Sequence, residues 1–168
     1  MKTRSALAIA VIGAASLGLT GCGAGQISQT ADQVAAVDGA SAETEDGAIQ
    51  IRDVTVSVTD TQQASLKFTA VNDEKNSGES IQLESVAIDG TPVTVSGNKI
   101  INSGCSLIVD SQKMITAMPQ ADRENMCATY AASSFTDPGA VPGQQREVVF
   151  SFSNGDVTVQ APVSKEME

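Results

Sequence analysis

Polar and apolar residues follow two different patterns along this chain of 168 residues. Residues 6–19 form a largely apolar run without a charge, which Lys2 and Arg4 precede. From residue 48 onward, apolar residues instead alternate with polar ones, as they do in β-strands with one buried face. The change of pattern divides the chain into an N-terminal segment with its own role and a folded part that is rich in strands.

The alternating part predicts seven or so short strands. The first covers residues 49–58, where the alternation shifts by one position at Arg52 and Asp53, and this shift predicts a β-bulge. Residues 64–70 and residues 105–109 alternate in the same way. The spacing of apolar residues therefore predicts sheets with one buried face.

Two turns join strands that are neighbours in the sequence. Asp89 and Gly90 favour a two-residue hairpin turn, which places Val86 opposite Val93. Pro92 follows this turn and cannot donate a ladder hydrogen bond, so we expect it at a sheet edge.

The second turn is predicted at Asn154 and Gly155, between strands at residues 146–152 and 156–163. With these two residues at the turn, Phe152 pairs with Val157, Phe150 with Val159, and Val148 with Ala161. All six side chains then lie on one face of the hairpin, as burial of that face requires.

The remaining segments complete an all-β prediction. Residues 72–80 are polar and predict a surface loop. Residues 110–145 contain three prolines and predict irregular structure, with a stretch at residues 124–135 whose structure the pattern leaves open. Short strands with turns between them, and no long helical period, favour a β-sandwich of antiparallel sheets. We expect this domain at residues 48–163 and a disordered tail at residues 164–168.

The N-terminal apolar run is typical of a signal peptide. It is shorter than the roughly 20 apolar residues that span a membrane, and it ends in small residues. Residues 19–22, Leu-Thr-Gly-Cys, complete a lipobox, in which Cys22 receives a diacylglyceryl thioether and becomes the mature N-terminus. We therefore predict a lipoprotein signal peptide at residues 1–21 and anchoring at the cell membrane, outside the cytoplasm. The alternative is an uncleaved anchor.

The composition of the chain predicts a flexible tether and a net negative charge. Residues 22–47 are predicted to be a flexible acidic tether, since they carry five acids, no base and no aromatic residue. Such a coil spans about 28 Å. Removing residues 1–21 leaves 8 basic residues against 20 acidic ones, a net charge of −12. Nucleic acid would be repelled by this charge, so we predict no nucleic-acid partner.

Cys105 and Cys127 are the two cysteines that remain once Cys22 is lipidated. Outside the cytoplasm an even pair favours a disulfide, which would stabilise the fold by about 3 kcal/mol. The alternative is a pair of thiolate metal ligands. Because the chain contains no histidine to complete such a site, we predict the disulfide.

The absence of histidine also excludes Ser-His-Asp and Cys-His catalysis. Ser96 and Lys99 show the Ser-x-x-Lys spacing of β-lactamase-type enzymes, but they follow a strand and do not begin a helix. Met114, Met118 and Met126 carry thioethers, which suit Cu(I), although methionine also fills gaps in loop-covered cores. We predict no enzyme activity, no cofactor and no dedicated metal site.

A resemblance to a known family adds to this picture. Residues 21–30, Gly-Cys-Gly-Ala-Gly-Gln-Ile-Ser-Gln-Thr, resemble the start of the actinobacterial LpqE-type envelope lipoproteins. The domain of that family is similar to the periplasmic copper chaperone PCu(A)C, and residues 66–72, 83–88 and 148–163 carry the resemblance here. It implies a Greek-key sandwich of the cupredoxin-like or immunoglobulin-like kind. The chaperones use methionine and histidine, and residues 127–131, Cys-Ala-Thr-Tyr-Ala, stand near the place of a His-x-Met element, so no family ligand carries over.

The sequence as a whole predicts a non-catalytic envelope lipoprotein. Its partners are expected to be the membrane, through the lipid at Cys22, and an envelope protein or glycolipid. An accessory subunit that positions or inhibits an envelope enzyme is a variant of this hypothesis. The alternative from another class is an extracytoplasmic copper carrier with methionine ligands.

Overall fold

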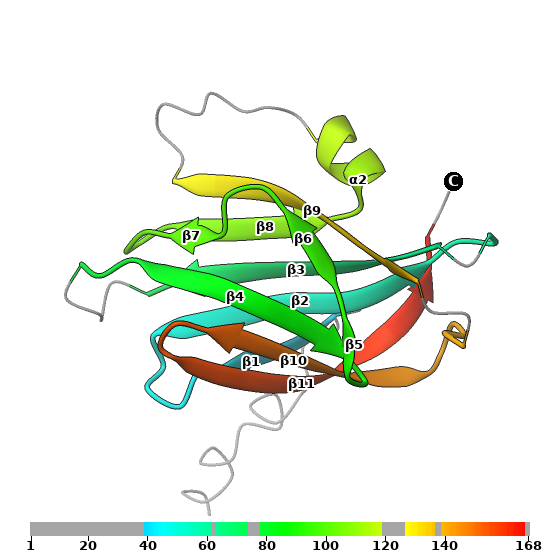
Figure 1. Ribbon diagram of the computed structural model, residues 1–168, viewed down its shortest axis with the longest axis horizontal. Coiled ribbons are helices and arrows are strands. Elements are labelled where there is room, and N and C mark those ends of the chain that lie inside the picture. Colours follow the sequence, from blue (N-terminus) through cyan, green and yellow to red (C-terminus); the bar gives the residue numbers. More distant parts are fainter. Residues whose placement is uncertain (1–38, 62, 74–77, 119–126, 137–138, 167–168) are drawn as a thin grey trace, which may run out of the picture. The chain divides into compact units, whose positions relative to one another are not determined.

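The structure is a computed structural model, and it describes residues 39–61, 63–73, 78–118, 127–136 and 139–166. In these ranges the chain forms eleven strands and one short helix, which confirms the predicted all-β fold (Figure 1). The strands are β1 (Ala40–Glu43), β2 (Ile49–Val58), β3 (Gln63–Asn72), β4 (Ile81–Ile88), β5 (Thr91–Pro92), β6 (Thr94–Ser96), β7 (Ile100–Ile101), β8 (Ser106–Asp110), β9 (Ala128–Thr136), β10 (Gln145–Phe152) and β11 (Gly155–Lys165), and the helix is α2 (Gln112–Ala117).

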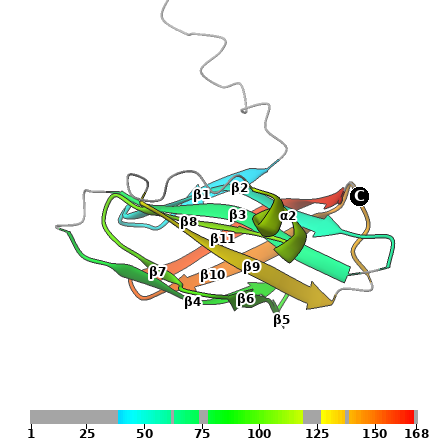
Figure 2. The ribbon, with the colours of Figure 1, turned by 90° about the horizontal axis from the view of Figure 1, so that it is seen from above.

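The strands form two layers that are joined at their edges. Their order is β5-β4-β10-β11-β2-β3-β8-β9-β6, with β1 beside β2 and β7 beside β4. Figure 2 shows β4 and β10 in one layer and β2, β3 and β8 in the other. Strands β5 and β6, at the two ends of this order, are separated in sequence by Val93 alone, so the sheet nearly closes on itself.

The core lies between the layers and is mainly aliphatic. Phe68 of β3 and Phe150 of β10 meet edge to face, with ring centroids 4.9 Å apart. Leu66, Leu83 and Leu107 are fully buried around them. The predicted alternation places these residues on the inner faces, and their burial is the main force that holds the layers together.

Two local predictions are confirmed. Between β2 and β3 the register shifts between Arg52 and Thr55, and Asp53 adopts a φ of 57° at this bulge. The Asp89-Gly90 turn has φ values of 47° and 80°, as a type I′ turn requires.

Val86 and Val93 also meet as predicted. The N–H of Val93 donates to the carbonyl of Val86 at 2.9 Å. Pro92 lies in β5, at one end of the strand order. The first hairpin is therefore correct in register and in position.

The predicted register of the last hairpin is wrong by two residues. Phe150 pairs with Val157 and Phe152 with Gly155, so the turn lies at Ser153 and Asn154. The buried face is unchanged, because a shift of two residues preserves the side-chain alternation.

Two features explain the shift. Among the described residues, Asp53 and Asp89 are the non-glycine positions with positive φ, so Asn154 does not adopt the conformation of a type I′ turn. Strand β4 also holds Ser153, whose N–H donates to Gln82 O at 2.9 Å and whose Oγ accepts from Gln82 N at 3.1 Å.

The domain extends beyond both predicted limits. β1 lies inside the segment predicted as tether and pairs with β2, with Ala42 opposite Ile51. At the other end β11 continues to Lys165, and the N–H of Glu166 donates to Val58 O at 2.9 Å. Backbone pairing with β2 orders both segments, although neither has a strong apolar pattern. The predicted signal peptide, residues 1–21, and the lipidation site Cys22 lie outside the described residues.

The prediction of irregular structure at residues 110–145 is wrong where α2 forms. The stretch at residues 124–135, whose structure the sequence left open, contains most of the nine-residue strand β9. β9 runs parallel to β8, from Ser106 opposite Ala128 onward, and β11 runs parallel to β2 at its end. These parallel pairs are exceptions within the otherwise antiparallel sandwich. No helix within the described ranges is long and apolar enough to cross a membrane.

Candidate binding site

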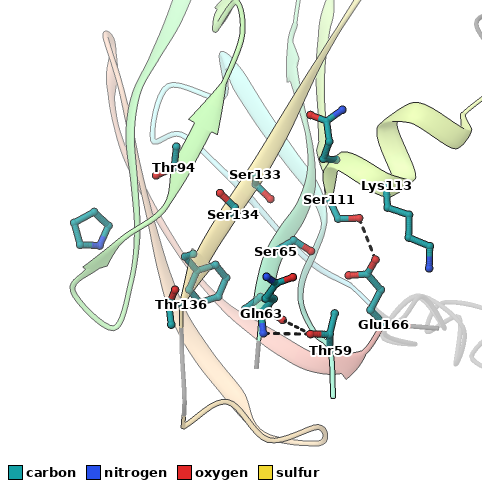
Figure 3. A pocket seen from close by; sticks show the side chains of 14 residues that line it. Thr59, Gln63, Ser65, Thr94, Ser111, Lys113, Ser133, Ser134, Thr136 and Glu166 are labelled. Atoms are coloured by element: carbon teal, nitrogen blue, oxygen red, sulfur yellow. Dashed lines mark hydrogen bonds between the residues drawn. The ribbon is translucent and has the colours of Figure 1, made fainter. Parts of the chain in front are cut away.

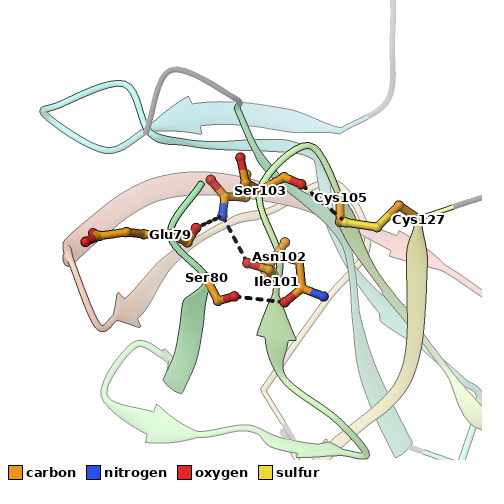
Figure 4. The surroundings of a disulfide bond; sticks show 8 residues. Glu79, Ser80, Ile101, Asn102, Ser103, Cys105 and Cys127 are labelled. Carbon is orange, nitrogen blue, oxygen red and sulfur yellow. Dashed lines mark hydrogen bonds between the residues drawn. A yellow bond between two sulfur atoms is a disulfide. The ribbon is translucent and has the colours of Figure 1, made fainter. Parts of the chain in front are cut away.

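The disulfide between Cys105 and Cys127 is present, as predicted (Figure 4). It joins the residues that precede β8 and β9, with their Cα atoms 4.7 Å apart. The N–H of Ser106 donates to Cys127 O at 2.9 Å, which begins the parallel ladder. Because the two cysteines directly precede β8 and β9, the bond holds the two strand starts together. Cys105 is buried.

Asn72 lies beside this disulfide and is fully buried, although the sequence predicted a surface loop from this residue onward. Its Nδ2 donates to Glu79 O at 2.9 Å and to Ile101 O at 3.0 Å. Its backbone N–H donates to Cys105 O at 3.0 Å. Asn72 thus connects the end of β3 with the segment before β4, with β7 and with the residue before β8.

Ser96 and Lys99, the Ser-x-x-Lys candidate, have different partners. Ser96 Oγ donates to Ala132 O at 3.1 Å, and Lys99 Nζ donates to Glu84 O at 3.0 Å. Activation of Ser96 as a nucleophile would require a hydrogen bond between Lys99 and Ser96. Lys99 instead binds a backbone carbonyl.

The methionine candidates are divided between described and undescribed residues. Met114 lies on α2 with 39% of its surface exposed, and Met118 caps the helix through an N–H that donates to Met114 O at 3.0 Å. Met126 lies outside the described residues. Within the described ranges no group of three or more His, Cys, Asp or Glu residues is arranged to hold a metal ion.

A polar groove of about 680 Å³ lies between β3, β9 and the start of α2 (Figure 3). This volume lies within the range of about 300–1,000 Å³ that is usual for small-molecule sites. Half of its 14 lining residues carry a hydroxyl group, namely Thr59, Ser65, Thr94, Ser111, Ser133, Ser134 and Thr136. We call this feature the hydroxyl groove.

The groove exists because β3 changes its neighbour along its length. Its first residues, Gln63 and Ala64, pair with β9, whereas its later residues from Phe68 onward pair with β8. Leu66 lies between these two ladders. Ser133 Oγ accepts from Leu66 N and donates to Leu66 O, both at 2.8 Å. One buried hydroxyl therefore completes the backbone pairing at the point where two strands diverge.

Ser65 lines the groove from the outer face of β3 and is only 4% exposed. Within the described part of the chain its Oγ has no hydrogen-bond partner. A buried hydroxyl without a partner costs about 1–3 kcal/mol of stability. The fold therefore tolerates a cost at this position, and a ligand group that reached this oxygen would remove the cost.

The opposite wall is held by Ser111 and Glu166. Ser111 Oγ donates to Glu166 Oε1 at 3.2 Å and accepts from Met114 N at 3.3 Å, so it both anchors Glu166, which follows β11, and caps α2. Lys113 lies on the same wall. The charges of Lys113 and Glu166 balance, so the described lining has no net charge.

A buried carboxyl lies directly behind this wall. Asp110 is 5% exposed, and its Oδ1 accepts from Ser111 N at 2.7 Å. Burial raises the pKa of Asp110, and the hydrogen bond from Ser111 opposes this effect.

Comparison with protein-family models gives no match to this chain. No curated protein matches it either. The groove was also not predicted from the sequence, because its walls come from segments near residues 59–65, 92–94, 111–113, 133–136 and 166. Serine and threonine in these segments read as ordinary loop or strand-surface residues.

Proposed function

We propose that this protein is a non-catalytic binding protein, anchored through a lipid at Cys22 to the cell membrane and facing outside the cytoplasm. Its ligand is an envelope protein or a glycolipid. The observation that carries the binding role is the hydroxyl groove with the unpartnered hydroxyl of Ser65. The lipobox pattern at residues 19–22 supports the location.

Several features favour binding over catalysis. The chain has no histidine, and Ser96 and Lys99 engage different backbone carbonyls. The groove is lined mainly by neutral groups that donate and accept hydrogen bonds, which suits recognition. The disulfide and the Ser133 contact hold its walls in place without a ligand, and a preformed site loses less entropy on binding.

Site-specific photo-crosslinking in intact cells tests the binding role. A photoreactive residue at Gln63, which is exposed in the groove, should give a discrete crosslinked species in the membrane fraction. The same residue at Thr158, which is exposed on β11 outside the groove, serves as the matched control. Equal labelling from both positions, or none from Gln63, would contradict the proposal.

The anchor has a separate test. The mass of the protein extracted from membranes should equal that of residues 22–168 plus a diacylglyceryl group on Cys22. An unmodified Cys22, or a retained 1–21 segment, would overturn the proposed location.

A copper carrier is the second candidate, favoured by one observation. Met114 lies on α2 and is exposed, and Met118 directly follows the helix, with its N–H donating to Met114 O at 3.0 Å, so the two methionines lie one helical turn apart. Titration with Cu(I) against a competing chelator should then show submicromolar binding that the Met114→Leu and Met118→Leu substitutions weaken. Micromolar or weaker affinity, unchanged by these substitutions, would exclude this candidate.

A further inference from the structure

We infer that the hydroxyl groove binds a neutral, polyhydroxylated ligand, namely a segment of uncharged glycan. The inference rests on the proposed binding function, because it names the ligand class of the same groove. Its starting point is the unpartnered hydroxyl of Ser65 at the base of a polar groove.

The chemistry of the lining matches sugar hydroxyls. Hydroxyl and amide side chains both donate and accept hydrogen bonds, as sugar hydroxyls do. Gln63, Ser134 and Thr136 present such groups at the exposed part of the groove. Phe135 packs against the core but is only half-buried and also lines the groove, so it adds an apolar surface suited to the C–H face of a sugar.

Charge argues against an ionic ligand. Lys113 and Glu166 are the charged residues among those described in the lining, and they balance. The chain without residues 1–21 carries a net charge of −12. An anionic polymer would meet this overall repulsion without a compensating basic patch in the groove, whereas a neutral polymer would not.

The backbone argues against a peptide that binds by adding a strand. Such a peptide needs free N–H and C=O groups at a strand edge. Between its ladders with β9 and with β8, strand β3 has the N–H and C=O groups of Leu66. Both groups are already hydrogen-bonded to Ser133 Oγ. The groove therefore offers side-chain groups and not an open backbone edge at this position.

The stability cost of the unpaired Ser65 hydroxyl also favours a hydroxylated ligand. Alanine would fit the same place without leaving a buried hydroxyl unpaired, so the fold itself gains nothing from the serine oxygen. A ligand hydroxyl that reached Ser65 Oγ would remove the cost only in the bound state.

Affinity electrophoresis of the full-length lipidated chain in detergent tests the inference. Native gels would contain a mannan, a dextran or an arabinan as neutral polymers, and polygalacturonate as an acidic one. At least one neutral polymer should retard the protein, and polygalacturonate should not. Ser65→Ala should weaken the interaction about tenfold, with an unchanged or higher Tm.

Ser57→Ala is the matched control. Ser57 pairs with Ser65 across β2 and β3, is half-buried, and does not line the groove. Its substitution should leave retardation unchanged. Thr136→Ala provides a second variant that changes an exposed side chain of the groove and keeps the fold intact, and it should weaken retardation severalfold.

Four outcomes would overturn the inference. They are no retardation by any neutral polymer, equal retardation by polygalacturonate, full binding by Ser65→Ala and Thr136→Ala, and an equal loss with Ser57→Ala. If a crosslink from Gln63 identified only a protein, the glycan would be the wrong ligand class while the binding function would hold. Loss of the Gln63 crosslink itself would contradict the binding function, so the two failures are distinguishable.

Discussion

Ser133 and Asn72 supply hydrogen bonds that the strands around them do not provide. Ser133 Oγ satisfies both backbone groups of Leu66, and Asn72 Nδ2 satisfies two carbonyls near the disulfide. Both residues are buried. At the scale of single residues, these polar side chains are therefore part of the framework, whereas Ser65 lies in the same sheet without a structural partner.

Replacing Ser133 by alanine should lower the free energy of unfolding by about 2–3 kcal/mol, because it leaves the N–H and C=O of Leu66 unpaired. Urea unfolding measures the loss. Ser134→Ala, at the exposed neighbouring position, should change the value by less than about 0.5 kcal/mol. Equal effects of the two substitutions would show that Ser133 does not support the backbone.

Replacing Asp110 by asparagine should stabilise the protein at pH 7. Burial raises the pKa of Asp110 above its ordinary value of 3.8, so the folded state binds the proton more tightly than the unfolded state. The wild type therefore loses stability as the pH rises from 3.8 through the raised pKa. Asparagine keeps an oxygen for Ser111 N and carries no charge.

The measurement is urea unfolding of both proteins from pH 7 down to pH 3.5. The advantage of the Asp110→Asn variant should shrink as the pH falls and should disappear below the ordinary aspartate pKa. A constant difference at all pH values would mean that charge burial is not its cause.

At the scale of elements, β8 and β9 depend on a covalent link. Their starts are joined by Cys105–Cys127, which closes a sequence separation of 22 residues. The helix α2 lies within this loop, and the groove lies where β9 leaves β8 and crosses to β3. Because β8 and β9 are parallel, they are joined by a long connection and not by a tight turn. A crosslink between their starts is therefore well placed to stabilise the pair.

Substitution of both cysteines by serine should lower the free energy of unfolding by about 3 kcal/mol, as the chain-entropy model gives for a loop of this length. Chemical denaturation of the oxidised protein and the double variant measures the difference. The reduced wild type is the control and should resemble the variant. A reduced protein as stable as the oxidised one would contradict a stabilising role.

Strand β1 should also contribute to stability, although it lies in a segment with the composition of a tether. Thr44, which follows β1, is buried, and its Oγ1 accepts from Ile49 N at 2.9 Å and donates to Asp46 Oδ1 at 2.6 Å. A chain that begins at residue 48 should therefore be less stable than one that begins at residue 39, by about 2 kcal/mol.

Thermal unfolding of the two shortened chains provides the measurement. The chain beginning at residue 39 should melt like the lipid-free 22–168 chain. Identical melting of the 39–168 and 48–168 chains would show that β1 is not part of the stable domain.

At the scale of the whole molecule, the proposed function depends on where the domain is held. Its net charge without residues 1–21 is −12, which does not favour adsorption to an anionic membrane surface. Attachment should therefore depend on the lipid alone. A Cys22→Ala chain should be absent from the membrane fraction after a wash in low salt, and detection of the protein by immunoblot measures this. Membrane retention of the variant equal to that of the wild type would contradict a single lipid anchor.

The extent to which the fold follows from the sequence can be seen by comparing its two turns. Asp89 and Gly90 form the type I′ turn that their sequence predicts, and the hairpin register follows from it. Asn154 and Gly155 carry a similar signal but do not form that turn, because β4 pairs with Ser153. Local turn chemistry thus decided one register, and a neighbouring strand decided the other.

The sequence by itself determined the all-β class, the buried faces of the main strands and the cysteine pairing. These depend on side-chain alternation and on the number of available thiols, and both are local or countable properties. It also carries the lipobox prediction for Cys22. Tertiary structure alone decided the β1 and β9 pairings, the burial of Asn72 and the hydroxyl groove. These arise where distant segments compete for backbone partners, and the outcome depends on which strands lie side by side.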